Sequence, residues 1–347
     1  MSVPSNNEVV AALTQWFASL HGAATEAVEL TDVRRHAEGW SWQTWTMTVT
    51  WPGGTAGYAV RREPEDGLLA PYDIEGQYRL HRAVVDHSDV PMAGLVALET
   101  DTSILGMPFY VMERVEGGVP AQWSGKDPQW FPTPEARRAL GEDFVAVLAR
   151  IHAIDPVTAD LGFLAPGGDL GVDCAAATAA FLDDLEEMYV ASALVEVPLV
   201  REAFAWCRES MTLSGRVTLV HGDYRIGNFM VRDGRVVAVF DWELSRIGDP
   251  VADLAYAGLP LFRGRSPLFS HMLERDDFLA TYEKHSGHAV DPAVFDWWTV
   301  ANHIQAAVPH LRAAAVYEDG TFDDLRLAAM GHQVNYVLRT LATELGI

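Results

Sequence analysis

Three polar side chains lie within one short stretch of the chain, whose sequence from His221 to Glu243 is HGDYRIGNFMVRDGRVVAVFDWE. Asp223 and Asn228 precede an apolar run, and Asp241 follows a second one. The Asp233-Gly234 pair between the runs is a favoured hairpin turn, which would bring Asn228 near Asp241. A carboxylate and an amide oxygen suit a hard cation such as Mg²⁺, and Asp223 would stand beside it as a separate carboxylate.

These groups are the ones that phosphoryl transfer requires. A metal ion bridges the phosphates of a nucleotide, and a carboxylate orients or deprotonates the attacking hydroxyl group. Protein kinases carry an Asp, a following Asn and a second Asp after a hairpin in this same order. We therefore predict that Asp223 is the catalytic carboxylate and that Asn228 and Asp241 hold Mg²⁺. The alternative for all three residues is local turn and capping chemistry.

The elements that must position these residues fall into two parts. Up to about residue 112 the chain is rich in strand signals, with one helix expected at its start and one over YDIEGQYRLHRAVVDH. Beyond it, most segments show the periodicity of helices, including PEARRALGEDFVAVLARIHAI. We predict an α+β fold with a small β-rich part over 1–112 and a larger helical part over 113–347.

Composition limits the kinds of partner. Of the 347 residues, 25 are Lys or Arg and 48 are Asp or Glu, which gives a formal net charge of −23. Binding to nucleic acids depends on basic side chains at the phosphates, so we expect no nucleic-acid partner. The two cysteines, Cys174 and Cys207, follow no disulfide or metal-binding pattern, and no stretch approaches a membrane span. We expect a cytoplasmic protein without a membrane partner; the oligomeric state, a homodimer included, stays open.

The motifs HGDYRIGN, FDWE and GDPVADLAY, together with YAVRREP and ARIHAID upstream, resemble the aminoglycoside phosphotransferase family. The resemblance spans nearly the whole chain and implies a bilobal fold like that of protein kinases. The segment WELSRIGDPVADLA is most similar to the kinase domains that are fused to acyl-CoA dehydrogenases. That branch implies small hydroxylated metabolites as acceptors, hydroxy acids and hydroxyacyl-CoA thioesters among them.

The resemblance also implies nucleotide-binding residues in the strand-rich part. Arg61, preferred over Arg62, would contact the phosphates, with Glu75 on the following helix as its ion-pair partner. Backbone groups of Glu113 and Val115 would pair with the edge of the base. The alternatives without a functional role are that Arg61 and Arg62 face solvent at the end of a strand and that Glu75 lies on a solvated helix face.

The expected phosphate loop, AEGWSWQTWTM, departs from the family pattern. It has a single glycine, Gly39, where backbone amides usually approach the phosphates. Ser41 fits the serine of the family pattern, but Trp42 stands where an asparagine is usual. For Trp40, Trp42 and Trp45 we favour core packing.

We expect a Mg²⁺-dependent kinase that transfers a phosphoryl group from ATP, with GTP as the other candidate donor, to a small-molecule hydroxyl. The acceptor site is predicted in the helical part, facing Asp223. An aminoglycoside is the alternative acceptor, and the negative net charge favours it. A nucleotide-binding pseudokinase is an alternative of another class. A two-metal phosphohydrolase ranks last, because His303, His310 and His332 lack the required context.

Overall fold

The computed structural model describes residues 6–36, 42–65, 67–68, 70–192, 194, 196–321 and 324–347. Its chain divides into two compact units, one made of Met1–Val85 and Met92–Glu116, the other of Asp86–Pro91 and Gly117–Ile347. The first unit carries an antiparallel sheet and the second is mainly helical, as the sequence predicted. The sequence-based division was placed after residue 112, whereas the first unit ends at Glu116 and Asp86–Pro91 are grouped with the second.

The first unit is built around a five-stranded antiparallel sheet with the strand order β1-β2-β3-β5-β4. Its elements, in chain order, are α1 (Asn6–Leu20), β1 (Glu29–His36), β2 (Gln43–Trp51), β3 (Gly54–Arg62), α2 (Ile74–His87), β4 (Leu95–Glu99), α3 (Thr102–Leu105) and β5 (Phe109–Glu113). Strands β2 and β3 form one antiparallel hairpin, and β4 and β5 form a second that the short helix α3 interrupts. Strand β1 was missed, because its charged and mostly exposed residues lack the strand alternation.

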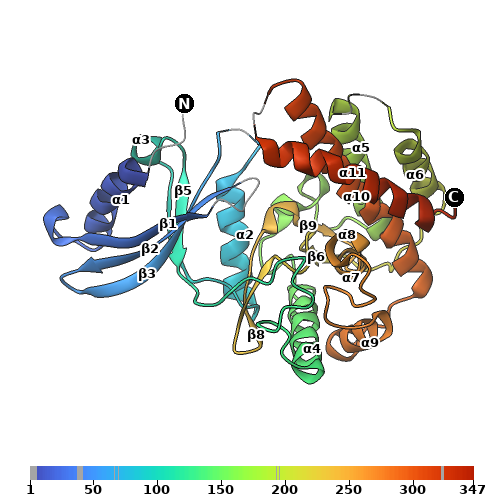
Figure 1. Cartoon of the computed structure of the whole chain (residues 1–347), viewed down its shortest axis with the longest axis horizontal. Coiled ribbons are helices and arrows are strands. Elements are labelled where there is room, and N and C mark those ends of the chain that lie inside the picture. Colours follow the sequence, from blue (N-terminus) through green and yellow to red (C-terminus); the bar gives the residue numbers. More distant parts are fainter. Residues whose placement is uncertain are drawn as a thin grey trace. The chain divides into compact units, whose positions relative to one another are not determined.

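The two faces of this sheet are covered by different helices (Figure 1). On one face, Leu13 and Phe17 of α1 pack with buried residues of the sheet, Trp45 among them. On the other face, Trp42 packs with Ile74 and Tyr78 of α2. Trp42 and Trp45 are therefore core residues, as expected, whereas Trp40 lies outside the described residues.

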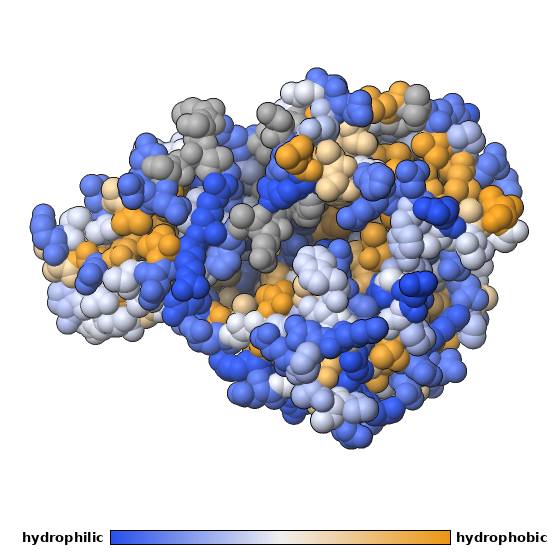
Figure 2. All heavy atoms as spheres, viewed as in Figure 1, coloured by the Kyte–Doolittle hydropathy of each residue, from blue (hydrophilic) through white to orange (hydrophobic). Residues whose placement is uncertain are grey.

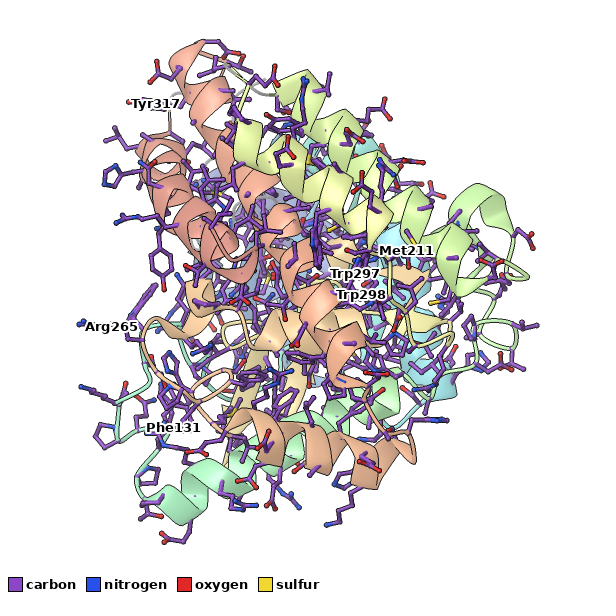
Figure 3. The ribbon with its side chains drawn as sticks, turned by 90° about the vertical axis from the view of Figure 1, so that its right-hand side faces the viewer. Phe131, Met211, Arg265, Trp297, Trp298 and Tyr317 are labelled. Carbon is purple, nitrogen blue, oxygen red and sulfur yellow. The ribbon has the colours of Figure 1, made fainter. Side chains whose placement is uncertain are left out.

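The second unit surrounds its short strands with helices. Its elements are α4 (Pro134–Ile151), α5 (Cys174–Ser192), α6 (Pro198–Glu209), β6 (Thr218–Val220), β7 (Phe229–Arg232), β8 (Arg235–Val239), β9 (Arg246–Gly248), α7 (Val251–Ala257), α8 (Pro260–Arg263), α9 (Arg275–Ser286), α10 (Pro292–Glu318) and α11 (Leu325–Glu344), with single 3₁₀ turns at Gly162–Leu164, Pro166–Gly168 and Trp242–Leu244. The long helix α10 packs against α5, α6, α7 and α11. Trp297 and Trp298 near its start are buried (Figure 3).

The predicted hairpin forms in this unit. Strand β7 pairs with β8 in antiparallel register, and Asp233 and Gly234 between them both have positive φ, 51° and 71°. A two-residue turn of this kind matches the twist of the strands it joins. Strand β6 pairs with β9, so the segments on either side of the hairpin are also held together.

Hydrophilic residues cover much of the surface visible in Figure 2, with apolar residues in separate groups. None of the helices in the described ranges combines the length and the apolar character that a bilayer crossing requires.

Candidate active site

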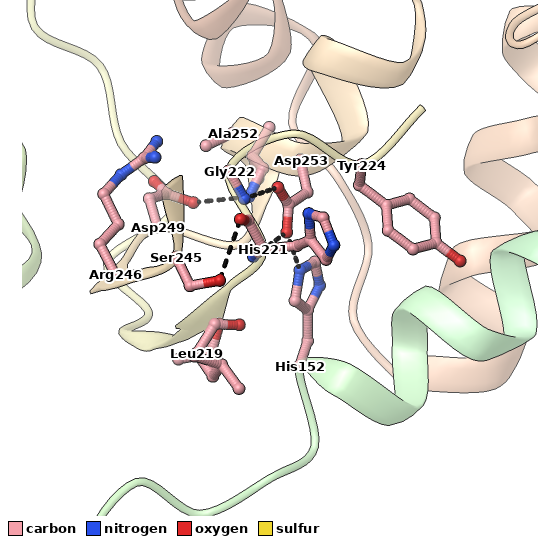
Figure 4. A network of polar contacts seen from close by, with 12 residues as sticks. His152, Leu219, His221, Gly222, Tyr224, Ser245, Arg246, Asp249, Ala252 and Asp253 are labelled. Carbon is pink, nitrogen blue, oxygen red and sulfur yellow. Dashed lines mark hydrogen bonds and ion pairs between the residues drawn. The ribbon is translucent and has the colours of Figure 1, made fainter. Parts of the chain in front are cut away.

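The loop His221-Gly222-Asp223 leaves the end of β6, and side chains rather than a sheet hold its backbone. The carboxylate of Asp253 in α7 accepts the amides of His221 at 2.7 Å and of Gly222 at 2.8 Å, and His152 Nε2 lies 3.1 Å from the same carboxylate (Figure 4). The amide of Asp223 donates to His221 Nδ1 at 3.2 Å. All three amides of the loop thus have a partner.

The carbonyl oxygens of the same three residues also accept side-chain donors. In chain order, the donors are Ser245 Oγ at 3.1 Å, Gln305 Nε2 at 2.6 Å and Asn228 Nδ2 at 2.9 Å. Buried backbone groups need such partners, because an unpaired one costs about as much as a lost hydrogen bond. The loop is therefore fixed on both sides along its length.

Gly222 is required by the path of this loop. Its φ is +84°, and a Cβ atom placed there would overlap the carbonyl oxygen of Leu244. A residue other than glycine would meet both a strained backbone and a backbone clash.

His221 is a structural member of the loop. Its Nδ1 accepts the Asp223 amide, so Nε2 carries the proton and donates to the carbonyl of Phe240 at 3.1 Å. Complete burial lowers the pKa of His221, despite the nearby charges of Asp253, Asp223 and Asp241. The ring therefore stays neutral and joins the loop to the end of β8.

The carboxylate of Asp223 is oriented by two neighbours. Arg225 Nε donates to Oδ1 at 2.9 Å, and Asn228 Nδ2 donates to Oδ2. The Arg225 guanidinium lies over the ring of Phe262, 4.7 Å from its centroid. Each carboxylate oxygen has two lone pairs, so these bonds leave acceptor capacity for a further hydroxyl group.

The structure brings Asn228 and Asp241 together as the hairpin predicted. The amide of Phe240, next to Asp241, donates to the carbonyl of Asn228 at 3.0 Å. Asn228 directs its Nδ2 to Asp223, which leaves its Oδ1 for a cation. Asp241 has a left-handed backbone, with φ 70° and ψ 52°, which costs a non-glycine residue energy and is typical of functional sites.

This pair can supply two oxygen ligands to a metal ion. Among the described residues, no group of three or more His, Cys, Asp or Glu side chains could hold one. Mg²⁺ is commonly bound by one or two carboxylates together with substrate phosphates and water. Asn228 and Asp241 therefore fit a metal that arrives with a nucleotide better than a metal held by protein ligands alone.

Asp249 and Asp253 both brace this region through their carboxylates. Asp249 accepts the amide of Val251 at 2.9 Å at the start of α7, and also the amide and hydroxyl of Ser214 at 2.8 and 2.9 Å. Asp249 thus ties the start of α7 to the segment before β6. Asp253, one helical turn further on, holds the loop itself.

Arg61 and Arg62, which are neighbours in β3, have different surroundings in the first unit. Arg62 is 1% exposed and donates to the carbonyl of Leu105 at 2.7 Å and to Gln43 Oε1 at 2.8 Å, so it is fixed within the sheet and α3. Arg61 points to the opposite face, where its guanidinium lies 4.9 Å from the ring centroid of Trp42. Burial lowers the pKa of His81 in α2 to about 4, and the charge of Arg61 adds to this shift.

The ion pair expected between Arg61 and Glu75 does not occur among the described contacts. Glu75 is exposed in the first turn of α2, while the Arg61 guanidinium stacks on Trp42. The predicted nucleotide contact of Ser41 lies outside the described residues.

The two residues expected to meet the base differ in their backbone groups. The amide of Glu113 donates to the carbonyl of Gly94 at 2.8 Å and is therefore committed within its own unit. Val115 follows the strand, and its backbone makes no hydrogen bond within the described part of the chain. Of the two amides, that of Val115 is the one left for a ligand.

Several contributors to the site were not identified from the sequence. Arg225 lies two residues after Asp223, and His152 and Gln305 come from helices far along the chain. The motif containing His152 was noted, but nothing in its spacing indicates a contact with Asp253.

The family model described as the phosphotransferase enzyme family (APH) matches residues 32–288. The chain belongs to this phosphotransferase family. The matched range includes the His221–Asp223 loop, both predicted metal ligands and Arg61, so the resemblance inferred from the motifs is confirmed.

Among curated proteins, this phosphotransferase is similar to acyl-CoA dehydrogenase family member 10 of Mus musculus, with 32% identity over 208 residues, which is 58% of this chain and 18% of the relative. It is 28% identical over 260 residues to acyl-CoA dehydrogenase family member 11 of Rattus norvegicus, or 70% of this chain and 31% of that protein. The chain thus spans less than a third of the length of these relatives.

Solved structures share the fold. A Ralstonia eutropha protein with a provisional aminoglycoside phosphotransferase assignment has a TM-score of 0.73 and 24% identity, over 96% of this chain and 97% of that one. A thermostable mutant of aminoglycoside phosphotransferase APH(4)-Ia, in a ternary complex with AMP-PNP and hygromycin B, has a TM-score of 0.61 and 17% identity, over 94% and 98% of the two chains.

Proposed function

We propose that this phosphotransferase moves the γ-phosphoryl group of ATP to a hydroxyl group of a small molecule, with Mg²⁺ bound by Asn228 and Asp241. The observation that carries the proposal is the fixed loop that presents Asp223 beside Asn228, within a chain of the phosphotransferase family. APH(4)-Ia, which shares the fold, was crystallised with an ATP analogue and an acceptor.

In the proposed reaction, Asp223 accepts the proton of the acceptor hydroxyl. The hydroxyl oxygen forms a bond to the γ-phosphorus, the bond from that phosphorus to the β,γ-bridging oxygen breaks, and ADP leaves. Bound Mg²⁺ would neutralise charge on the phosphates. Arg225 and Asn228 hold the Asp223 carboxylate in place by their hydrogen bonds. Arg61 is proposed to contact phosphate groups and Val115 to pair with the base.

The first test concerns the metal ligands. We expect Asp241→Asn to lower ADP formation at saturating acceptor by roughly 10²-fold or more, because a charged ligand to the cation is lost at the reacting phosphate. Steady-state turnover measured over a range of Mg²⁺ concentrations checks this, and circular dichroism checks the fold. Turnover with wild-type dependence on Mg²⁺ would contradict the assignment.

The nucleotide-binding pseudokinase remains the alternative of another class. It is favoured by the single glycine in the expected phosphate loop, whereas the ordered Asp223 and the paired Asn228 favour turnover. The same turnover assay, run with ATP and with GTP, compares the two candidate phosphoryl donors. Nucleotide binding without ADP formation for any acceptor would favour the pseudokinase.

For the acceptor we propose a hydroxy acid or a hydroxyacyl-CoA thioester. The identity to acyl-CoA dehydrogenase family members, 32% and 28%, exceeds the 17% identity to APH(4)-Ia. An aminoglycoside is the second candidate, because the net charge of −23 attracts a polycation. Long-range attraction is screened beyond about 8 Å at physiological salt, so we give the local site more weight.

Comparative kinetics at fixed ionic strength test the acceptor class. We expect kcat/KM for at least one hydroxy acid or thioester to exceed that for hygromycin B and streptomycin by tenfold or more, about 1.4 kcal/mol of transition-state binding. A higher kcat/KM for either aminoglycoside would show that the acceptor assignment is wrong and leave the phosphotransferase assignment intact.

A further inference from the structure

Arg246, in the short strand β9, has an incompletely paired guanidinium. Its Nη1 reaches only the carbonyl of Leu244, at 3.5 Å, and its buried Nη2 has no hydrogen-bond partner within the described part of the chain. No described carboxylate forms an ion pair with it. The residue as a whole is half-buried, but a cationic nitrogen that is shielded from water without a partner is costly.

The surroundings of Arg246 hold the guanidinium in place without neutralising it. Its central carbon lies 4.0 Å from the ring centroid of Phe181 in α5 and 5.9 Å from that of Trp298 in α10. Burial lowers the pKa of Arg246 to about 10, so the group stays charged at neutral pH. Phe181 and Trp298, whose centroids are 5.7 Å apart, thus support a cation.

The nearest acidic residues already have other partners. Asp249 and Asp253 act on Arg246 only at longer range. The oxygens of Asp249 accept donors from Ser214 and Val251, and those of Asp253 accept the loop amides and His152. Figure 4 accordingly draws Arg246 without a dashed contact. These carboxylates are therefore not the missing counter-ion.

One face of α10 leads from Arg246 to the catalytic loop. Trp298, Asn302 and Gln305 are spaced by four and three residues, so they share this face. The amide nitrogens of Asn302 and Gln305 donate to the carbonyls of Ala252 and Gly222. Trp298 Nε1, Asn302 Oδ1 and Gln305 Oε1 have no hydrogen-bond partner within the described residues.

Strand pairing also places Arg246 beside the segment that enters the catalytic loop. Arg246 in β9 is the register partner of Val220 in β6, the residue immediately before His221. The neighbouring Trp297 shows the contrast with Trp298, because its Nε1 donates to the carbonyl of Cys207 at 3.1 Å. Of the four buried side-chain atoms of α10 without a hydrogen-bond partner within the described residues, three thus lie on the face that reaches the loop through Gln305, and the fourth is His303 Nε2.

We propose that Arg246 binds the carboxylate of an acceptor that carries its hydroxyl group at Asp223, with Phe181 and Trp298 beside the connecting carbon chain. A guanidinium pairs with a carboxylate through two parallel hydrogen bonds and would use the free Nη2. A thioester carbonyl has no charge and would leave Arg246 without an anion. The inference rests on the proposed function and narrows its acceptor to a free hydroxy acid.

The experiment compares short hydroxy acids, with varied spacing between hydroxyl and carboxyl groups, against their primary amides and CoA thioesters. In the wild type, kcat/KM for the best acid should exceed that for its amide by roughly 10- to 100-fold, the effect of one charge-assisted pair. Arg246→Met should abolish this preference by raising the KM of the acid, and leave the amide within threefold. Arg246→Lys should recover part of the preference.

Arg339→Gln is the matched control, because Arg339 is an exposed arginine on α11 of the same unit. It should leave the preference unchanged, and thermal unfolding should show that each variant is folded. Calorimetric binding of the acid, with AMP-PNP present, tests Arg246 independently of turnover. Equal binding by wild type and Arg246→Met, or no binding of any acid to wild type, would overturn the inference. If the enzyme phosphorylates an aminoglycoside and Arg246→Met does not change that rate, the inference about Arg246 is overturned, while the phosphotransferase assignment stands.

Discussion

Replacing Asp223 by asparagine is expected to lower kcat for phosphoryl transfer by roughly 10²- to 10⁴-fold, the usual contribution of a positioned general base. Asparagine has the same shape and can still accept the hydrogen bond from Arg225, but it cannot take a proton. The KM for ATP should stay within threefold, because the acceptor hydroxyl and not the nucleotide faces this carboxylate in the proposed reaction. Steady-state kinetics with the best acceptor provide the measurement.

Asp233→Asn is the matched control for that variant. It makes the same change of charge ten residues further along, at the exposed turn between β7 and β8. Asparagine tolerates the positive φ of 51° at this position, so the hairpin should be kept. If Asp223→Asn keeps kcat within threefold of Asp233→Asn, Asp223 is not the base.

The parts of the site that the sequence predicted are local in the chain. The Asp233-Gly234 turn fixes the register of β7 and β8, and this register places Asn228 near Asp241. Residue types with strong backbone preferences determine such geometry over a few positions. The alternation of side chains along β3 likewise separates Arg61 from Arg62, whereas the pairing of Arg61 with Glu75, inferred from resemblance alone, stays a prediction.

The parts that were missed depend on contacts between distant segments. Gln305 reaches the carbonyl of Gly222 from α10, and His152 reaches Asp253 from the end of α4. Neither residue has a local pattern that indicates a loop contact, because the packing of whole helices decides which side chains meet. Arg246 was missed for the same reason, since its stacking on Phe181 joins β9 to α5.

The loss of charge at Asp253 should have the largest effect on stability. We expect Asp253→Asn to lower the free energy of unfolding of the second unit by about 3 kcal/mol, because buried donors lose their carboxylate acceptor. One carboxylate oxygen accepts the Gly222 amide, and the other accepts the His221 amide and faces His152. An amide nitrogen at either position would face donors that it cannot accept. Denaturant unfolding followed by tryptophan fluorescence measures the loss, and catalytic activity should fall with it.

The pH dependence distinguishes this mechanism from a simple packing defect. Burial by itself would raise the pKa of Asp253, but the hydrogen bond and charge of His152, with donation from His221, hold this pKa below its usual value. A carboxyl whose folded pKa is depressed stabilises the protein above its unfolded pKa, about 3.9, and loses that contribution as pH falls through the folded value. The difference in free energy of unfolding between wild type and Asp253→Asn should therefore be constant from about pH 5 to 7 and shrink in more acidic solution.

The control variant is Asp296→Asn, which removes an exposed ion-pair partner of Arg275. It should lower the free energy of unfolding by less than about 1 kcal/mol. If Asp253→Asn lowers the free energy of unfolding no more than Asp296→Asn does, or if its effect does not shrink in acid, the buried charge of Asp253 does not hold the loop.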